Sequence, residues 1–294
     1  MLILRAPAKV NLVLEVLGKR NDGYHEIRTI LQTVDLCDTL KLELADTFHF
    51  ECPVEALQGL ENLVVRAARL LAEAAGVKSG VSITLDKRIP WGVGLGGGSS
   101  DAAACLLGLN RLWGLNMSVD QLRPIGERLG SDVPFFLYGG TCLVEGKGER
   151  VLPLPDLLSP WVVLLVPYLP VVTEKTRRMY QSLTQMDMSD GNKVEVVYRR
   201  LTKGEPVSSD LLFNAFERMA QQMFPGLTAY WQQFETAARE KVLLCGSGPA
   251  LFSLHPTKEA AETVVSRLKE RGIEANAVRC LGRAAGVVKA GSNG

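Results

Sequence analysis

The sequence contains no apolar run long enough to cross a lipid bilayer. The run at residues 161–167 is far shorter than the roughly 20 residues that a membrane-spanning helix requires. The start of the chain also lacks the basic stretch and the apolar, cleavable segment of a secretory signal. We therefore expect a cytosolic protein with no membrane partner.

The chain also lacks an excess of charge of either sign. Lys and Arg number 33 and Asp and Glu number 32, so the formal net charge is +1. A protein that binds nucleic acid or an anionic membrane through its overall field carries a strong basic excess. We expect no nucleic-acid partner, and any phosphate-binding site must be local.

Cysteine and histidine are too sparse and too dispersed to indicate a metal site. The six cysteines form no C-x-x-C pair, and the three histidines lie far apart along the chain. A chain of 294 residues can bury a sizeable core without disulfide bonds. We expect reduced, mostly buried thiols and no metal held by the protein's own side chains.

What the sequence does contain is typical of a folded protein with two domains. Apolar residues make up 47% and charged residues 22% of the chain, which excludes disorder and coiled coil. Pro153, Pro155 and Pro160 interrupt both helix and sheet, and mark a boundary. We predict an N-terminal domain over 1–155 and a C-terminal domain over 156–294.

Apolar periodicity and capping residues predict an α+β fold in both parts. In the first part we expect strands over 2–52 with a turn at 20–23, a helix from Asn62 to Gly76, a strand at 81–85, a helix capped by Ser99 to Asp101 and running to about 113, a helix from Ser118 to 129, and a strand at 135–144. In the second part we expect a strand at 161–166, helices near 174–184, 193–202, 211–223 and 226–239, strands at 242–245 and 250–254, a helix at 257–271 and a strand at 273–278.

The most informative stretch is PWGVGLGGGSSD at 90–101, in which five of the seven positions 92–98 are glycine. Glycine-rich backbone exposes amide groups that can surround an anion. A helix follows directly, so its free N–H groups and the hydroxyls of Ser99 and Ser100 aim at the same place. The stretch predicts a phosphate-binding loop, with a tight turn that merely needs positive φ as the structural alternative.

Known nucleotide loops of other classes do not match this stretch. The P-loop needs Lys before its Ser or Thr, whereas Ser99 follows Gly98 directly. The dinucleotide spacing G-x-G-x-x-G is met by Gly92, Gly94 and Gly97, but no βαβ unit surrounds it. The protein-kinase motifs H-R-D and D-F-G are missing from the sequence.

The loop resembles the ATP loop of the GHMP kinases, a superfamily that includes galactokinase, homoserine kinase and mevalonate kinase. Two further superfamily motifs flank it in order, APAKVNL at 6–12 and LCGSGPALF at 244–252. The segment GKRNDGYHEI at 18–27 is similar to the members that phosphorylate the 2-hydroxyl of a methylerythritol joined to cytidine diphosphate, in the non-mevalonate isoprenoid pathway. The resemblance covers nearly the whole chain, and GSDVPFF at 130–136 and NAFE at 214–217 extend it.

This resemblance implies a two-domain α+β fold with the active site in the cleft between the domains, ATP with Mg²⁺, and a catalytic pair. The residues implied to hold ATP are Pro90, Gly92, Gly94, Leu95, Gly96, Gly97, Gly98, Ser99 and Ser100. The implied base is Asp132, with Lys9 beside it to keep the carboxylate ionised and oriented. From the residues alone, the plain alternatives are a capping or turn residue for Asp132 and a solvated surface lysine for Lys9.

The resemblance further implies a small-molecule cytidyl diphosphate substrate. Asn11, Tyr24 and His25 would hold it, since an aromatic face stacks on cytosine and polar groups read its edge. Tyr180 in the pattern Thr-x-x-x-Tyr would close the pocket, although the same pattern counted from Thr173 selects Arg177. Lys147 would contact phosphate. Hairpin turns are the plain alternative for Tyr24 and Lys147.

Two rival functions are also compatible with parts of this sequence. Another small-molecule kinase of the superfamily, such as a mevalonate or homoserine kinase, would share the loop and the catalytic pair but not the Gly-Tyr-His sequence at 23–25. A nucleotide-binding module without catalysis would not need both Lys9 and Asp132. A phosphotransfer assay distinguishes the three.

Overall fold

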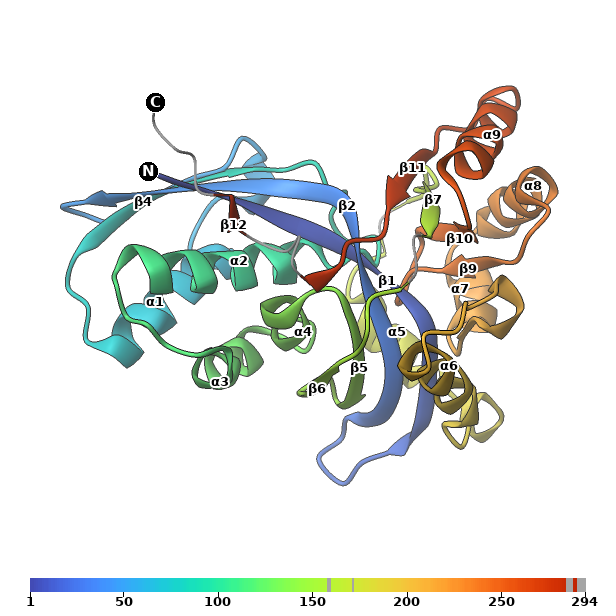
Figure 1. The fold of residues 1–294 in the computed structure, drawn as a ribbon, viewed down its shortest axis with the longest axis horizontal. Coiled ribbons are helices and arrows are strands. Elements are labelled where there is room, and N and C mark those ends of the chain that lie inside the picture. Colours follow the sequence, from blue (N-terminus) through green and yellow to red (C-terminus); the bar gives the residue numbers. More distant parts are fainter. Residues whose placement is uncertain (158–159, 171, 284–287, 290–294) are drawn as a thin grey trace.

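The fold is built around one long antiparallel pair of strands near the N-terminus, shown by a computed structural model that describes residues 1–157, 160–170, 172–283 and 288–289. Strands β1 (Leu2–Lys19) and β2 (His25–Ala45) pair over almost their whole length, joined by the predicted turn at 20–23. Figure 1 shows the pair running through the middle of the molecule. Helices and further strands are arranged along it.

The strands of the described residues form two separate sheets. The larger contains β1, β2, β3 (His49–Glu51), β4 (Gly80–Asp86), β5 (Thr141–Gly146), β6 (Arg150–Pro153), β8 (Phe213–Asn214) and β12 (Val288–Lys289). The smaller has the order β11 (Asn276–Arg279), β7 (Trp161–Leu165), β10 (Leu251–His255), β9 (Val242–Leu244). The β2 strand pairs with β4 near one end and with β5 near the other, so it forms the spine of the larger sheet.

Helices cover each sheet and complete an α+β fold. On the larger sheet lie α1 (Leu63–Ala75), α2 (Gly97–Leu112), α3 (Val119–Leu129) and α4 (Val133–Tyr138). The second half of the chain adds α5 (Lys175–Gln181), α6 (Asn192–Thr202), α7 (Glu217–Met223), α8 (Leu227–Ala238) and α9 (Lys258–Lys269). Figure 1 shows α8 and α9 beside the smaller sheet. None of the helices in the described ranges is long and apolar enough to span a membrane.

The predicted domain boundary at 155/156 falls between β6 and β7, where the chain passes from one sheet to the other. Later segments return to the first sheet, because β8 pairs with β1 and β12 also pairs with β1. The division into two domains stays a prediction.

Several local predictions are confirmed by hydrogen bonds at helix ends. The Asn62 side chain accepts a hydrogen bond from the Val64 N–H at 2.9 Å, and Gly76 ends α1 in a left-handed conformation. Ser118 caps α3 together with Gln121. All six cysteines are buried and free, as expected.

Three local predictions are wrong. Helix α2 begins at Gly97, two residues before the predicted serine cap, because Gly96 turns the chain in a left-handed conformation. Residues 133–138 form α4 instead of a strand, since Pro134 suits a first helical turn and a short apolar run does not distinguish helix from strand. The helix expected over 211–223 starts only at Glu217, because 213–214 pair with β1.

Candidate active site

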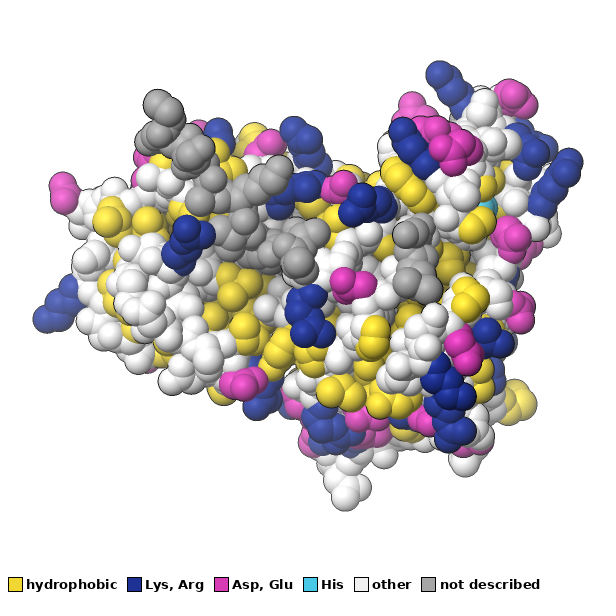
Figure 2. Space-filling view, viewed as in Figure 1, with side chains coloured by type: hydrophobic (Ala, Val, Ile, Leu, Met, Phe, Trp, Pro, Cys, Tyr) yellow, Lys and Arg dark blue, Asp and Glu magenta, His cyan; other side chains and the backbone are white. Residues whose placement is uncertain are grey.

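A cavity of about 960 Å³ lies where the two parts of the chain meet. Its walls come from β1, the hairpin after it, the glycine loop, residues 131–132, the turn at 147–148, α5 and the turn at 246–247. Among its described lining residues the basic side chains are Lys9, Lys19, Lys147, Lys175 and Arg177, and the one carboxylate is that of Asp132. A nearly neutral chain, whose visible surface in Figure 2 mixes both charges, thus surrounds this cavity with cations.

The glycine loop forms one wall of the cavity. Gly92, Gly94 and Gly96 have φ values of 75°, 96° and 73°, a region that favours glycine. A Cβ on Gly94 would lie 1.9 Å from the carbonyl oxygen of Cys245, so the loop also packs directly against the turn after β9. At this position glycine is required both by its φ and by a backbone contact.

The start of α2 presents the features expected of a phosphate site. The helix begins at Gly97 with no side-chain cap, which leaves its first N–H groups free for a ligand. Ser99 lines the cavity, and the hydroxyl oxygen of Ser100 is buried with no partner among the described residues. The free N–H groups and the Ser99 hydroxyl are donors of the kind that bind the phosphates of a nucleotide.

Most of the other residues predicted to hold ATP lie outside the cavity lining. Pro90, Gly92, Gly97, Gly98 and Ser100 do not line the cavity. Leu95 is buried, and its carbonyl oxygen accepts a hydrogen bond from the Lys9 N–H at 3.0 Å. This hydrogen bond connects the backbone of the loop to β1 at Lys9, whose side chain is buried.

Lys9 and Asp132 meet inside the cavity although 123 positions separate them in the chain. The Lys9 Nζ atom lies 3.9 Å from the Asp132 Oδ2 atom, and Lys9 is only 4% exposed. It also donates to the Asn11 Oδ1 atom at 2.8 Å, and Asn11 donates to the Thr29 hydroxyl at 3.0 Å. Lys9 is thus not a solvated surface lysine.

Asp132 lies at the N-terminus of α4 but makes no side-chain capping bond there. Its side chain is 42% exposed and faces the cavity. The turn interpretation of this residue is therefore correct as geometry, because Asp132 lies in the turn before α4. The carboxylate does not cap the helix and is available to a ligand.

Behind the loop lies a buried ion cluster that the sequence analysis did not identify. The Lys87 ammonium contacts Asp38 and, at 2.7 Å, Asp101. Burial raises the pKa of Asp101 to about 8 despite the nearby Lys87 charge. Asp38 also accepts hydrogen bonds from the N–H groups of Arg88 and Ile89. Because Asp101 lies on α2, the cluster joins the helix start to β2 and to the chain entering the loop.

Aromatic side chains line the other end of the cavity. His25 and Tyr180 stack with ring centroids 5.1 Å apart, and the Tyr180 ring meets Phe216 edge-on at 4.9 Å. Tyr24 is 55% exposed, and the Lys147 ammonium lies 4.8 Å from its ring centroid. The hairpin interpretation of Tyr24 is also correct as geometry, since its carbonyl oxygen accepts from the Arg20 N–H at 2.8 Å. The turn presents the ring to the cavity.

The two alternatives for closing this pocket differ in position. Tyr180 is part of the aromatic group, and burial raises the pKa of its hydroxyl. Arg177 also lines the cavity, but its guanidinium is exposed and pairs with Glu174 at 3.4 Å.

The turn at 246–248 connects the glycine loop to the second half of the chain. The Ala250 N–H donates to the Val93 carbonyl oxygen at 3.1 Å. Asn214 is buried, and its amide donates to the carbonyl oxygens of Leu244 at 2.9 Å and Gly246 at 2.8 Å. In the sequence, Asn214 stands out only as part of the resemblance to a known family, and no pattern singles out Lys175, which also contacts this turn.

Asn214→Ala is expected to lower the free energy of unfolding by about 2 kcal/mol, because it leaves two buried carbonyl groups and the Phe216 N–H without a partner. Urea denaturation measures the change. The control is Asn276→Ala, at an exposed position in β11. Superimposable unfolding curves for Asn214→Ala and the unsubstituted protein would contradict this role.

Comparison with known proteins identifies the family. Residues 62–140 match the family model described as the GHMP kinases N terminal domain. A 4-diphosphocytidyl-2-C-methyl-D-erythritol kinase of Dehalococcoides mccartyi is 44% identical over 96% of this chain and 99% of its own length. A protein of the same name from Bacillus cereus is 40% identical over 96% of this chain and 97% of its own length.

Solved structures agree with this result. A crystal structure of 4-(cytidine 5'-diphospho)-2C-methyl-D-erythritol kinase is similar with a TM-score of 0.81 at 38% identity, covering 95% of this chain and 99% of that one. Homoserine kinase from Cytophaga hutchinsonii has a TM-score of 0.76 at 21% identity, covering 96% and 94%, and so shares the fold alone. The chain therefore belongs to the ATP-using GHMP kinases, and within them to the 4-diphosphocytidyl-2-C-methyl-D-erythritol kinase family of the non-mevalonate isoprenoid pathway.

Proposed function

We propose that this protein transfers the γ-phosphoryl group of ATP to the 2-hydroxyl of 4-diphosphocytidyl-2-C-methyl-D-erythritol within the cavity described above. The observation that carries this proposal is the position of the Lys9–Asp132 pair, which lines the same cavity as the glycine loop and the aromatic group of Tyr24, His25 and Tyr180. This shared cavity supports the proposal that a nucleoside triphosphate and a cytidyl acceptor bind beside the same Lys9–Asp132 pair.

In the proposed reaction Asp132 accepts the proton of the acceptor hydroxyl. The hydroxyl oxygen forms a bond to the γ-phosphorus, the bond from that phosphorus to the β–γ bridging oxygen breaks, and ADP leaves with the electron pair. The Lys9 ammonium, 3.9 Å from the Asp132 Oδ2 atom, would orient this carboxylate towards the acceptor hydroxyl. Phosphoryl transfer depends mainly on positioning and charge stabilisation, which suits a weak carboxylate base.

The loop backbone and the α2 N-terminus would hold the phosphates of ATP. Ser99 lines the cavity and Ser100 does not, so the Ser99 hydroxyl is the loop hydroxyl that could contact Mg²⁺. Within the described ranges no group of three or more His, Cys, Asp and Glu side chains could hold a metal ion. An Mg²⁺ ion that accompanies ATP would be held largely by the nucleotide phosphates. When bound with ATP, Mg²⁺ neutralises phosphate charge.

The aromatic end would bind the cytidyl group. The Lys147 ammonium covers one face of the Tyr24 ring, and the exposure of Tyr24 leaves surface on which cytosine can stack. Tyr180 would close the pocket from α5, and His25 and Asn11 offer polar atoms to the substrate. Lys147, which also lines the cavity, would contact the diphosphate.

A panel of acceptors tests the proposed function directly. The purified protein is incubated with ATP and Mg²⁺ and with 4-diphosphocytidyl-2-C-methyl-D-erythritol, mevalonate or homoserine, and ADP release is measured. We expect ADP release with the cytidyl acceptor and not with mevalonate or homoserine. Preferred turnover of mevalonate or homoserine would overturn the substrate, and no turnover with any acceptor would favour a binding module.

Tyr24→Ala is expected to weaken binding of the cytidyl acceptor by about 5- to 150-fold, which corresponds to the 1–3 kcal/mol of base stacking on an aromatic ring. Tyr24→Phe should lose much less, because the ring face is retained. Isothermal titration with the acceptor measures both variants, and the melting temperature detects a purely structural role. Unchanged acceptor affinity in Tyr24→Ala would exclude stacking on this residue.

A further inference from the structure

A second lysine of the cavity is not used by the mechanism above. Lys175 is the first residue of α5, is half-buried and lines the cavity. Its Nζ atom donates hydrogen bonds to the Ser247 hydroxyl at 2.8 Å and to the Gly248 carbonyl oxygen at 2.5 Å. An ammonium group has three donors, so one remains for a ligand.

Lys175 and Lys9 contact the same short turn. A Cβ on Gly246 would lie 2.9 Å from the Lys9 Nζ atom, whereas Lys175 bonds to the next two residues of that turn. The same turn, at 246–248, also packs against Gly94 of the glycine loop. Two ammonium groups are thus placed beside the loop where the phosphates of ATP would lie.

The charges around Lys175 are not balanced. Asp132, the carboxylate of the cavity lining, lies 3.9 Å from Lys9, while Lys175 has no acidic partner within 4.0 Å among the described residues. Burial, and then the charge of Lys9, lower the pKa of Lys175 to about 8. Like charges held together away from solvent destabilise each other, and an anion bound between them removes that cost.

We propose that Lys175 contacts the γ-phosphoryl group of ATP and stabilises the negative charge on its oxygens while the group moves to the acceptor. The inference rests on the proposed function for the identity of the donor, but not for the identity of the acceptor. Lys175 takes no proton in this step: the acceptor proton goes to Asp132, the new O–P bond forms, and ADP carries away the electron pair of the broken bond.

A purely structural role is the alternative. Lys175 could serve only to hold α5 against the turn at 246–248, since Thr176 also lies 2.9 Å from the Ser247 hydroxyl. In that case a neutral side chain that can still donate a hydrogen bond would replace it. Stability, and not the phosphoryl group, would then respond to substitution.

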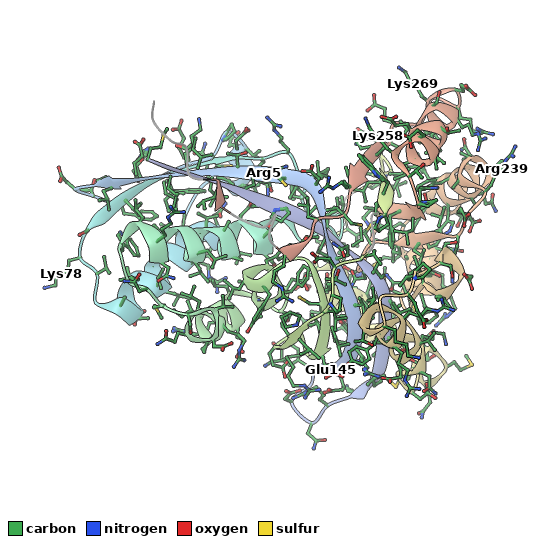
Figure 3. The ribbon with its side chains drawn as sticks, viewed as in Figure 1. Arg5, Lys78, Glu145, Arg239, Lys258 and Lys269 are labelled. Atoms are coloured by element: carbon green, nitrogen blue, oxygen red, sulfur yellow. The ribbon has the colours of Figure 1, made fainter. Side chains whose placement is uncertain are left out.

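The experiment compares Lys175→Met, Lys175→Gln and Lys175→Arg with Lys78→Met, a change at an exposed lysine at the far end of the molecule (Figure 3). Binding of ATP and of ADP is measured without any acceptor. We expect Lys175→Met to weaken ATP binding about tenfold, the usual scale for one hydrogen bond to a charged group, with ADP binding changed less than threefold. Lys78→Met should alter neither.

Turnover provides the second measurement. Loss of one donor to a developing charge lowers kcat by about 10²-fold, and we expect this for both Lys175→Met and Lys175→Gln. Lys175→Arg should recover part of the rate because the charge is retained. A rate within threefold of the unsubstituted protein in Lys175→Met, or full recovery in Lys175→Gln, would overturn the proposal.

The pH profile separates charge from structure. In the unsubstituted protein kcat/KM for ATP should fall as the pH rises through about 8 and Lys175 loses its proton, and the fall should be absent in Lys175→Arg. The ionisable groups that face Lys175 are Lys9, Asp132 and Cys245, and burial raises the pKa of the Cys245 thiol to about 12. An identical profile in both proteins would count against Lys175.

The outcomes also separate this inference from the proposed function. If the cytidyl acceptor is not a substrate but ATP binding still depends on Lys175 and ADP binding does not, the acceptor is wrong and the phosphoryl contact stands. If the cytidyl acceptor is phosphorylated at the same rate with and without Lys175, the function stands and the contact is wrong.

Discussion

Asp132→Asn is expected to lower kcat by about 10²- to 10⁴-fold, the range for loss of a positioned general base. An amide cannot accept the hydroxyl proton at neutral pH, yet its shape is nearly that of the carboxylate. Because Asp132 makes no helix-capping bond and its side chain faces the cavity, the fold should be unaffected. Steady-state kinetics measures kcat, and titration with ATP should show nearly unchanged affinity.

Asp46→Asn is the matched control for this change, since Asp46 is exposed between β2 and β3. Its kcat should equal that of the unsubstituted protein. Near-normal turnover in Asp132→Asn, with a normal melting temperature, would show that another group accepts the proton and that Lys9 has a different partner in the reaction.

Gly94→Ala should lower kcat/KM for ATP by about 10³-fold. The φ of 96° is unfavourable for alanine, and the strain accounts for about tenfold, or roughly 1.4 kcal/mol. The new Cβ would lie 1.9 Å from the Cys245 carbonyl oxygen, so the loop must move by more than an ångström. A displacement of about 1 Å at a reacting centre can cost a further 10²-fold.

Gly114→Ala is the control for backbone strain at a position outside the cavity. Gly114 has a φ of 66°, but a Cβ there would have nothing within 4 Å. It should lose some thermal stability and keep its kcat/KM for ATP. Titrations of Gly94→Ala with ATP and with the cytidyl acceptor complete the test, and equal losses of both affinities would mean that the loop does not serve ATP in particular.

Local structure, such as helix starts and turns, could be predicted from the sequence because the residues that determine it lie close together in the chain. Asn62 and Ser118 start helices through hydrogen bonds to N–H groups two and three positions away. The turn at 20–23 and the glycine loop likewise follow from residue types that are adjacent in the chain. The resemblance to a known family added the expectation that Lys9 and Asp132 work together, and the structure brings them within 3.9 Å.

Errors arose where a distant partner decided the local conformation. Residues 213–214 pair with β1 and so delay the start of α7, although their apolar pattern suits a helix. Pro134 and its apolar neighbours form a short helix that packs into the core beneath the larger sheet. Propensity is a weak guide at such positions, because burial against other elements outweighs it.

The sequence by itself determined the α+β class, the glycine loop and the residue types available for phosphoryl transfer, since these depend on short-range pattern and on motifs. Only the tertiary structure decided which polar and charged groups meet in the cavity and behind the glycine loop. Lys87 meets Asp38 from 49 positions away, and Lys175 meets Ser247 from 72 positions away. Such contacts arise when sheets and helices pack, and because burial sets their strength, no pattern of neighbouring residues could reveal them.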